Sequence, residues 1–372
     1  MKIGIDARLI NETGVGRYIR NLLVHLSRID KTNTYCLFLR SDAYESFRVP
    51  GSNFTKVLAD VPWHSVKEQI VMPQILTAAR LDLLHVPYFN LPIFYSGKMI
   101  ATIHDLTILH FDTGRATTRS WVFYKLRRIG YRLILWWGLR KAVGIIAVSQ
   151  STKEELIDHF HTPAEKILVT YEGVDEAIIR GKHTNKSDRP LIEKPYFLYV
   201  GNAYPHKNLE ALIGAFRKFL RSLVATTTSP KLVLVGGHDF FYNRLHQEVS
   251  ELGLDQSVIF FGRASDKQLI NLYCNSLALV FPSLMEGFGL PALEAVSLGA
   301  RVLLSDIPVF HEIVGNRATY FDPESEDDLA QKLHEIRKQP QVVSTLGFDT
   351  GLFNWDRLAQ DTLHLYERCT RL

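Results

Sequence analysis

The sequence predicts an α/β protein made of two doubly wound parallel-sheet domains. Short apolar runs alternate with amphipathic helical patterns along nearly the whole chain, which is typical of parallel sheets covered by helices on both faces. The runs form two series, and a polar stretch over residues 180–194 separates them. A length of 372 residues suits two domains of ordinary size.

These observations place the domain boundaries. We expect an N-terminal domain over 1–180, a linker over 181–194, a C-terminal domain over 195–351 and a closing helix over 352–372, for which the first domain is a candidate packing surface. Both domains are expected to be Rossmann-like. Ligands of open parallel sheets bind beyond the carboxyl ends of the strands, so functional residues should lie on the loops that follow strands, in a cleft between two facing sheets.

The individual elements follow from periodicity. The strand candidates of the first series are residues 2–7, 35–40, 82–87, 98–104, 144–149 and 167–173, and those of the second are 196–201, 231–237, 257–262, 277–283 and 301–306. Helical patterns lie between them. Ile19, Leu22, Leu23 and Leu26 are spaced three and four residues apart, so they share one helix face.

Composition excludes several classes of protein. The three cysteines, Cys36, Cys274 and Cys369, are far apart and lack metal-ligand spacing, which predicts neither disulfides nor a zinc site and favours the cytoplasm. The first ten residues look like a buried strand rather than a leader, and no run reaches the roughly eighteen apolar residues of a membrane span. No Asp-x-Asp follows an apolar strand, and the acids of 323–333 suit a helix start, so no essential metal and no bound cofactor are expected.

The stretch with the most candidate functional residues is SLMEGFGLPALEAVSLGARVLLSD, residues 283–306, at the end of the strand candidate 277–283. Pro291 at the first position and Gly299 near the end frame a helix. Gly287 and Gly289 let the backbone approach a ligand closely, so that several amides and the helix dipole face one anion. A diphosphate fits this description.

Two glutamates flank that turn. Glu286 and Glu294 have seven residues between them, which is too far for a close acid/base pair but suits two parts of one elongated ligand. Carboxylates accept hydrogen bonds from hydroxyls, of which sugars carry many. The alternative is that neither glutamate binds a ligand. Glu286 would then be a solvent-exposed residue of the turn, and Glu294 would lie in the first turn of the helix because the helix dipole favours a negative charge there.

Other loops after strands carry weaker signals. Residues 11–18, NETGVGRY, contain Gly14 and Gly16, but Ile19 stands where a dinucleotide fingerprint needs its third glycine, which makes a dehydrogenase a poor reading. His104 follows the strand candidate 98–104, where a lone histidine is either a structural hydrogen-bonding residue or a ligand contact. Lys207 follows 196–201 and, taken alone, could be a solvent-exposed lysine at a helix start.

Taken together, these motifs resemble the retaining GT-B glycosyltransferases of the Glu-x7-Glu type, group 1, similar to bacterial mannosyl- and glucosyltransferases of surface polysaccharide synthesis. The segment 283–306 resembles the family signature of two glutamates around a Gly-Phe-Gly-Leu-Pro turn. The resemblance extends to TIHDLTILH, GIIAVSQSTKEEL, YEGVD, YVGNAYPHKNLEALI and NWDRLAQDTLHLYERC. It covers nearly the whole chain with several motifs in the same order.

The resemblance implies roles for the site residues. Glu294 would bind ribose hydroxyls and Glu286 sugar hydroxyls of a nucleotide sugar, while Lys207 would neutralise the diphosphate that leaves. His104 would contact the acceptor or the transition state. The resemblance does not support a role for His104 as a general base. The backbone contacts to sugar and diphosphate would come from Gly14, Gly16, Gly201, Asn202, Gly287, Phe288, Gly289 and Leu290.

Two positions depart from the family pattern. Asn202 and His206 stand where many members carry arginine, so the second cation at the phosphates is unassigned; Arg263 is a candidate but could instead flank the base. The resemblance implies a metal-independent hexosyltransferase that uses UDP-glucose or GDP-mannose, with a slight preference for UDP, and a polysaccharide or lipid-linked oligosaccharide acceptor. A GT-B epimerase or phosphorylase and a hinge-type sugar-binding protein are the alternatives.

Residues 114–153 stand apart from this pattern. They contain nine Lys or Arg and no acid, interleaved with aromatic residues, although the net charge of the whole chain is only +4. Such a segment suits the anionic surface at the inner face of a cell membrane. A core helix with solvated arginines is an equally good interpretation, whereas nucleic-acid binding lacks any accompanying motif.

Overall fold

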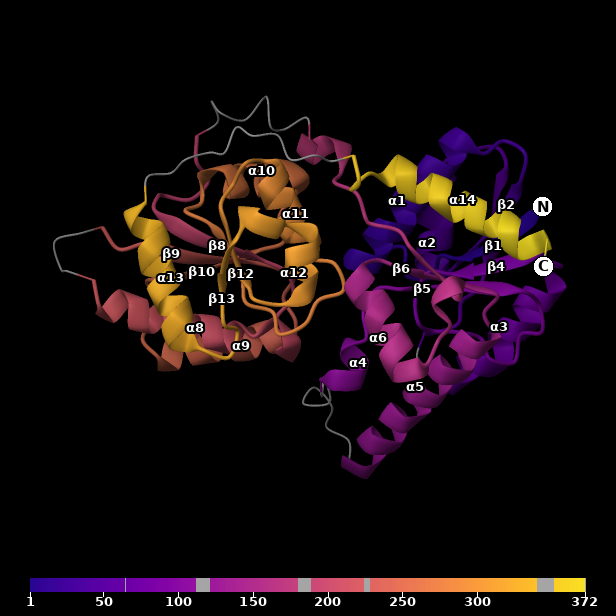
Figure 1. The fold of residues 1–372 in the computed structure, drawn as a ribbon, viewed down its shortest axis with the longest axis horizontal. Coiled ribbons are helices and arrows are strands. Elements are labelled where there is room, and N and C mark those ends of the chain that lie inside the picture. The colour runs from indigo at the N-terminus through magenta and orange to yellow at the C-terminus, as the bar shows by residue number, and fades with distance from the viewer. Residues whose placement is uncertain (64, 112–120, 180–188, 224–227, 340–350, 372) are drawn as a thin grey trace. The chain divides into compact units, whose positions relative to one another are not determined.

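The computed structural model describes residues 1–372 except 64, 112–120, 180–188, 224–227, 340–350 and 372 (Figure 1). The chain divides into two compact units. Unit 1 consists of Met1–Leu109, Arg119–Gly173 and Gly351–Leu372, and unit 2 of His110–Thr118 and Val174–Thr350. Most of the expected linker 181–194, and the first part of the basic segment, lie outside the described residues.

Each unit contains one sheet in which every strand pair is parallel, so the predicted α/β class with two parallel sheets is confirmed. The strands of unit 1 are β1 (Lys2–Asp6), β2 (Thr34–Leu39), β3 (Phe54–Leu58), β4 (Leu83–Val86), β5 (Met99–Ile103), β6 (Gly144–Ala147) and β7 (Ile167–Val169). Those of unit 2 are β8 (Tyr196–Val200), β9 (Lys231–Val235), β10 (Val258–Gly262), β11 (Leu279–Phe281), β12 (Val302–Ser305) and β13 (Thr319–Phe321).

The strand orders define one switch point in each sheet. Unit 1 has the order β3-β2-β1-β4-β5-β6-β7 and unit 2 the order β10-β9-β8-β11-β12-β13. In unit 1, successive strands of the chain are added toward one edge of the sheet from β1 to β3 and toward the other edge from β4 to β7. In unit 2 the same change occurs between β8 and β11, and the strands themselves stay parallel. Loops on the two sides of a switch point diverge, which leaves a crevice at the carboxyl ends of the strands.

The sequence missed two strands, β3 and β13, each of which lies at one edge of its sheet. Most positions of β3 are partly or fully exposed, and β13 has three residues, of which only Phe321 is buried. An edge strand is covered less than a central one, so it lacks the continuous apolar run that marks a buried parallel strand. Every predicted strand range overlaps a strand of the structure.

The helices of unit 1 surround its sheet. They are α1 (Gly14–Ile29), α2 (Ser41–Ser46), α3 (Val66–Ala78), α4 (Thr107–His110), α5 (Trp121–Lys141), α6 (Gln150–Phe160) and α14 (Trp355–Arg371), with a short 3₁₀ helix at Ala164–Lys166. The predicted apolar face of α1 is buried: Ile19, Leu22, Leu23 and Leu26 are all fully covered. Residues of α14 share this core, so residues 351–372 belong to unit 1.

Unit 2 is built in the same way. Its helices are α8 (Leu209–Arg221), α9 (Phe240–Glu251), α10 (Asp266–Asn275), α11 (Leu290–Ser297), α12 (Pro308–Ile313) and α13 (Glu326–Lys338), with 3₁₀ helices at Pro205–Lys207 and Gly315–Arg317. The acids of 323–333 open α13 as predicted, because Ser325 caps it by accepting a hydrogen bond from the Asp328 amide at 3.1 Å.

No helix in the part of the chain that the structure describes combines the length and the apolar character needed to cross a bilayer.

Candidate functional site

The switch point of unit 2 brings together two of the predicted loops. The loop after β8 leads through the 3₁₀ helix Pro205–Lys207 into α8, and the loop after β11 leads into α11. Strands β8 and β11 are neighbours, with Leu279 opposite Leu198. The two loops also touch directly, since the Leu284 amide donates to the His206 carbonyl at 2.8 Å.

Lys207 and Glu286 form an ion pair between these two loops. The Lys207 ammonium lies 2.6 Å from Glu286 Oε1, and the side chains are only 14% and 9% exposed. The Ser283 hydroxyl donates to the same oxygen at 2.6 Å, and the ammonium lies 5.6 Å from the centre of the Phe281 ring. A carboxylate that accepts from two donors on one oxygen is held in a fixed orientation, and its Oε2 makes no hydrogen bond to any described residue.

The turn after Glu286 is shaped by glycine. Gly289 adopts φ +93°, in the left-handed region, and a Cβ there would lie 2.7 Å from the Phe310 ring. Gly289 is also the N-cap of α11, whose first residues are Leu290 and Pro291, so no side chain caps the positive end of this helix. The local geometry is therefore that of an anion-binding helix start.

Glu294 lies one turn into α11 and is 2% exposed. Its Oε2 accepts a hydrogen bond from the Tyr273 hydroxyl of α10 at 2.9 Å. A buried carboxylate needs hydrogen-bond donors to offset its loss of hydration. Tyr273 supplies one such donor, which fixes the carboxylate at the start of the helix.

The remaining predicted residues of unit 2 occupy neighbouring loops. Gly201 and Asn202 follow β8; the Gly201 carbonyl accepts from Tyr242 at 2.9 Å and the Asn202 carbonyl accepts from Tyr199 at 2.6 Å. Arg263 follows β10 and is exposed. It lies over the loop after β9, since a Cβ on Gly237 would be 3.3 Å from Arg263 Nε.

The switch point of unit 1 holds a buried charge cluster that sequence reasoning missed. Arg8, which follows β1, lies 2.6 Å from both Asp6 Oδ2 and Glu68 Oε1, and its side chain is 3% exposed. It also donates to the Val61 carbonyl at 3.1 Å. Burial alone lowers the pKa of the Arg8 guanidinium, but the carboxylates of Asp6 and Glu68 outweigh burial and raise the pKa above its ordinary value.

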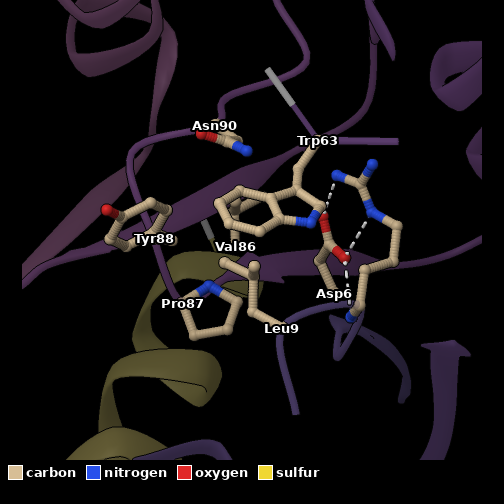
Figure 2. Close-up of a pocket in the computed structure, with 8 residues that line it drawn as sticks. Asp6, Leu9, Trp63, Val86, Pro87, Tyr88 and Asn90 are labelled. Atoms are coloured by element: carbon tan, nitrogen blue, oxygen red, sulfur yellow. Dashed lines mark hydrogen bonds and ion pairs between the residues drawn. The ribbon is translucent and has the colours of Figure 1, made fainter. Parts of the chain in front are cut away.

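A small cavity of about 10 Å³ lies beside this cluster at the carboxyl ends of β1 and β4 (Figure 2). Aromatic rings and an amide surround it together with the charges; the lining residues are Asp6, Arg8, Leu9, Trp63, Val86, Pro87, Tyr88 and Asn90. A volume of this size holds about one water molecule.

His104 follows β5 at the same edge of the sheet. Its Nδ1 lies 3.1 Å from Glu172 Oε1, and its Nε2 lies 3.2 Å from the Pro87 carbonyl oxygen. Glu172 belongs to the YEGVD segment quoted above, but the sequence assigned it no role. The structure thus pairs His104 with an acid 68 residues further along the chain.

The two glycines before α1 differ in their surroundings. A Cβ on Gly16 would lie 2.6 Å from the Ile10 carbonyl oxygen, so a close backbone approach requires glycine there. A Cβ on Gly14 would meet nothing within 4 Å, so Gly14 leaves open space at the start of the helix. Thr13, the N-cap residue, makes no side-chain cap.

Two further observations concern titratable groups. Burial, reinforced by the charge of Asp105, raises the pKa of Glu155 on α6 to about 7.

No group of three or more His, Cys, Asp or Glu residues in the described segments is arranged to hold a metal ion.

Comparison with known proteins identifies the family. Residues 13–178 match the model described as Glycosyltransferase Family 4, and residues 182–346 match the model described as Glycosyl transferases group 1. Together the two models span most of both units. The chain belongs to the group 1 glycosyltransferases.

Several curated relatives of this glycosyltransferase are named mannosyltransferases. It is 26% identical to the O-antigen chain mannosyltransferase RfbU of Salmonella typhimurium over 94% of both chains. It is also 26% identical to the O-antigen chain mannosyltransferase B of Escherichia coli, over 77% of this chain and 74% of that protein.

Solved structures share the fold. A sucrose-phosphate synthase from Thermosynechococcus elongatus superposes with a TM-score of 0.74 at 20% identity, covering 99% of this chain and 98% of that one. The Anabaena protein HepE, solved with UDP and glucose, gives a TM-score of 0.70 at 17% identity, covering 98% and 99%. The GT-B architecture expected for this glycosyltransferase is therefore confirmed.

Proposed function

We propose that this glycosyltransferase transfers a mannosyl group, with retention of configuration and without a metal ion, from a nucleoside diphosphate sugar to a hydroxyl of a saccharide acceptor. The observation that carries the proposal is the Lys207–Glu286 ion pair beside the uncapped start of α11. The names of the curated relatives favour mannose, and hence GDP-mannose over the UDP donor that sequence alone slightly favoured.

Each residue of unit 2 has a distinct task in this scheme. Breaking the anomeric C–O bond leaves negative charge on the diphosphate, which the Lys207 ammonium and the first turn of α11 stabilise. The free Oε2 of Glu286 accepts a hydrogen bond from a sugar hydroxyl. Glu294 accepts hydrogen bonds from the ribose hydroxyls and so binds the nucleotide.

The new bond forms from the acceptor oxygen to the anomeric carbon on the face that the phosphate leaves. The acceptor hydroxyl must lose its proton, and the departing phosphate oxygen takes it, so no protein base is consumed. This scheme requires a positioned cation and positioned hydrogen-bond acceptors, which are the groups that unit 2 provides.

A donor assay with a matched binding measurement tests the function. We expect GDP-mannose to be turned over faster than UDP-glucose, with unchanged rate in EDTA and an α-linked product from an α-linked donor. Glu294→Gln keeps an acceptor for Tyr273 but loses the charge, so the Kd for the nucleoside diphosphate should rise roughly ten- to a hundredfold, equivalent to about 1.5–3 kcal/mol. Glu251→Gln, at the exposed end of α9, is the control.

Some results would contradict the proposal. Turnover of neither donor, together with no thermal stabilisation by UDP or GDP, would remove the function. Equal affinity of wild type and the Glu294 variant would remove the ribose role of Glu294.

We also propose that helix α5 docks on an anionic membrane surface. Its exposed face carries Ile129, Leu133, Trp136 and Trp137, which are 54%, 60%, 37% and 53% exposed and lie within two helical turns or so of one another. The opposite face is buried, and a Cβ on Gly138 would lie 2.4 Å from Leu91. An apolar stripe on the solvent side of a surface helix is typical of an interaction face.

Cations border this stripe. Arg132 and Arg140 are exposed, and the Arg140 guanidinium lies 4.1 Å from the centre of the Trp136 ring. Not every cation of the basic segment takes part, because Lys141 and Lys153 donate to the carbonyls of Ile93 and Ile167. The residues 114–120, and the side chains of 121–128, lie outside the described part of the chain.

Vesicle co-sedimentation checks the docking surface. Arg132→Gln with Arg140→Gln should weaken binding to anionic vesicles by roughly tenfold or more, since each cation near such a surface contributes about 1 kcal/mol. Arg221→Gln with Arg244→Gln makes the same change of charge at exposed positions of unit 2 and should leave binding unchanged. Wild-type binding should also fall as salt rises. Wild type that stays in the supernatant at low salt would overturn the proposal.

A further inference from the structure

Both ring nitrogens of His104 face hydrogen-bond acceptors. Nδ1 lies 3.1 Å from the Glu172 carboxylate and Nε2 lies 3.2 Å from the Pro87 carbonyl oxygen. A carbonyl cannot donate, and an ionised carboxylate cannot either. With the Glu172 carboxyl ionised, both contacts are hydrogen bonds only when both nitrogens carry hydrogen, as in an imidazolium.

Glu172 supplies the reason for that state. Its side chain is 6% exposed, and His104 is its only hydrogen-bond or ion-pair partner within the described segments. A buried carboxylate is costly unless a cation is paired with it. The position of Glu172 is itself constrained, because a Cβ on the next residue, Gly173, would lie 2.5 Å from the Trp355 amide nitrogen.

Other described residues near the ring are a tyrosine, a threonine, a neutral histidine and the neighbouring Asp105. Tyr18 meets His104 edge-on, with ring centres 4.8 Å apart at 90°, and the Tyr18 hydroxyl pairs with Thr102 Oγ1 at 3.1 Å. The Thr102 hydroxyl also pairs with His85 Nε2 at 2.8 Å. Burial, followed by the charge of His104, lowers the pKa of His85 to about 3, so His85 is neutral. Asp105 is turned to the Thr107 amide at 3.0 Å.

We propose that Glu172 is a positioning residue that holds His104 as a double hydrogen-bond donor, so that the ring offers a fixed positive charge and no basic nitrogen at the carboxyl edge of the unit 1 sheet. His104 then cannot take the proton of the acceptor. The effect on transfer rests on the function proposed above, whereas the hydrogen-bonding state of the ring does not.

Nuclear magnetic resonance of protein labelled with ¹⁵N in histidine tests the state of the ring directly. At neutral pH the wild type should show two N–H groups for His104, assigned by their loss in His104→Asn. Glu172→Gln should leave one N–H, while Glu165→Gln, at an exposed carboxylate of the same unit, should leave both. A single N–H in the wild type would overturn the proposal even if the Glu172 variant does not fold.

The kinetic consequence is measured separately. Glu172→Gln should lower kcat about tenfold or more with little change in the KM for the donor, because a displaced contact slows the chemical step. Glu172→Asp, which keeps the charge, should recover part of the loss. Equal kcat values for the glutamine variant and the wild type would show that Glu172 positions nothing needed for transfer. Absence of any transfer by the wild type, with two N–H groups on His104, would count against the proposed function alone.

Discussion

Replacing Lys207 with alanine is expected to lower the rate of glycosyl transfer about a hundredfold or more. The Lys207 ammonium is held 2.6 Å from Glu286 Oε1, so in the proposed mechanism it would stabilise the leaving diphosphate without reorganising. Removing one preorganised electrostatic contact of this kind typically costs a factor of about 10²–10³ in kcat. The measurement is kcat with saturating donor and acceptor.

The matched control is Lys218→Ala on α8. Lys218 also pairs with carboxylates, Glu326 at 3.1 Å and Asp327 at 2.7 Å, but this pair is exposed and should matter little. Lys207→Ala also leaves the Glu286 carboxylate without its cation. The double variant Lys207→Ala with Glu286→Gln removes that unpaired charge, so it separates the loss of the ammonium from the effect of the unpaired carboxylate. Full activity of the Lys207 variant would remove the lysine from the mechanism.

Replacing Arg8 with methionine is expected to destabilise unit 1 by about 3–5 kcal/mol. The change leaves the carboxylates of Asp6 and Glu68 buried without their cation, since these side chains are only 10% and 4% exposed. Breaking a buried ion pair from one side costs about this amount, because the remaining charge has lost its hydration and its partner. Urea unfolding, followed by a probe in unit 1, measures the loss.

A second ion pair in the same unit provides the comparison. Arg40 lies 3.5 Å from Asp60, and the two side chains are 37% and 50% exposed. Arg40→Met should change the free energy of unfolding far less than Arg8→Met does. Adding Asp6→Asn and Glu68→Gln to the Arg8 variant should restore part of its stability. An Arg8 effect as small as that of Arg40 would contradict the assignment.

The sequence predicted the central parts of both sheets because a parallel strand that is covered on both faces is a continuous apolar run. The edge strands β3 and β13 lack that run, so periodicity alone could not find them. The same reasoning explains the success at α1, where four apolar residues at helical spacing define one buried face.

The site was predictable where its residues are close in sequence. The frame from Glu286 to Glu294 contains its own glycines and proline, and the structure places it at a helix start. Contacts between distant residues were not predictable: Lys207 and Glu286 are 79 residues apart, Arg8 and Glu68 are 60 apart, and His104 and Glu172 are 68 apart. The sequence shows the charges, but only the sheet topology decides which of them meet.

The arrangement of the two units along the chain has a consequence for biosynthesis. Residues 174–350 of unit 2 are inserted between two parts of unit 1, whose core needs Trp355, Leu358 and Leu365 of α14 against the buried face of α1. A nascent chain therefore completes its second unit before its first. At about 5–20 residues per second, the apolar face of α1 waits roughly 17 to 70 seconds for its cover. During that interval the emerging polypeptide exposes this apolar face, and a fragment that ends at Gly173 would lack the α14 part of the core permanently.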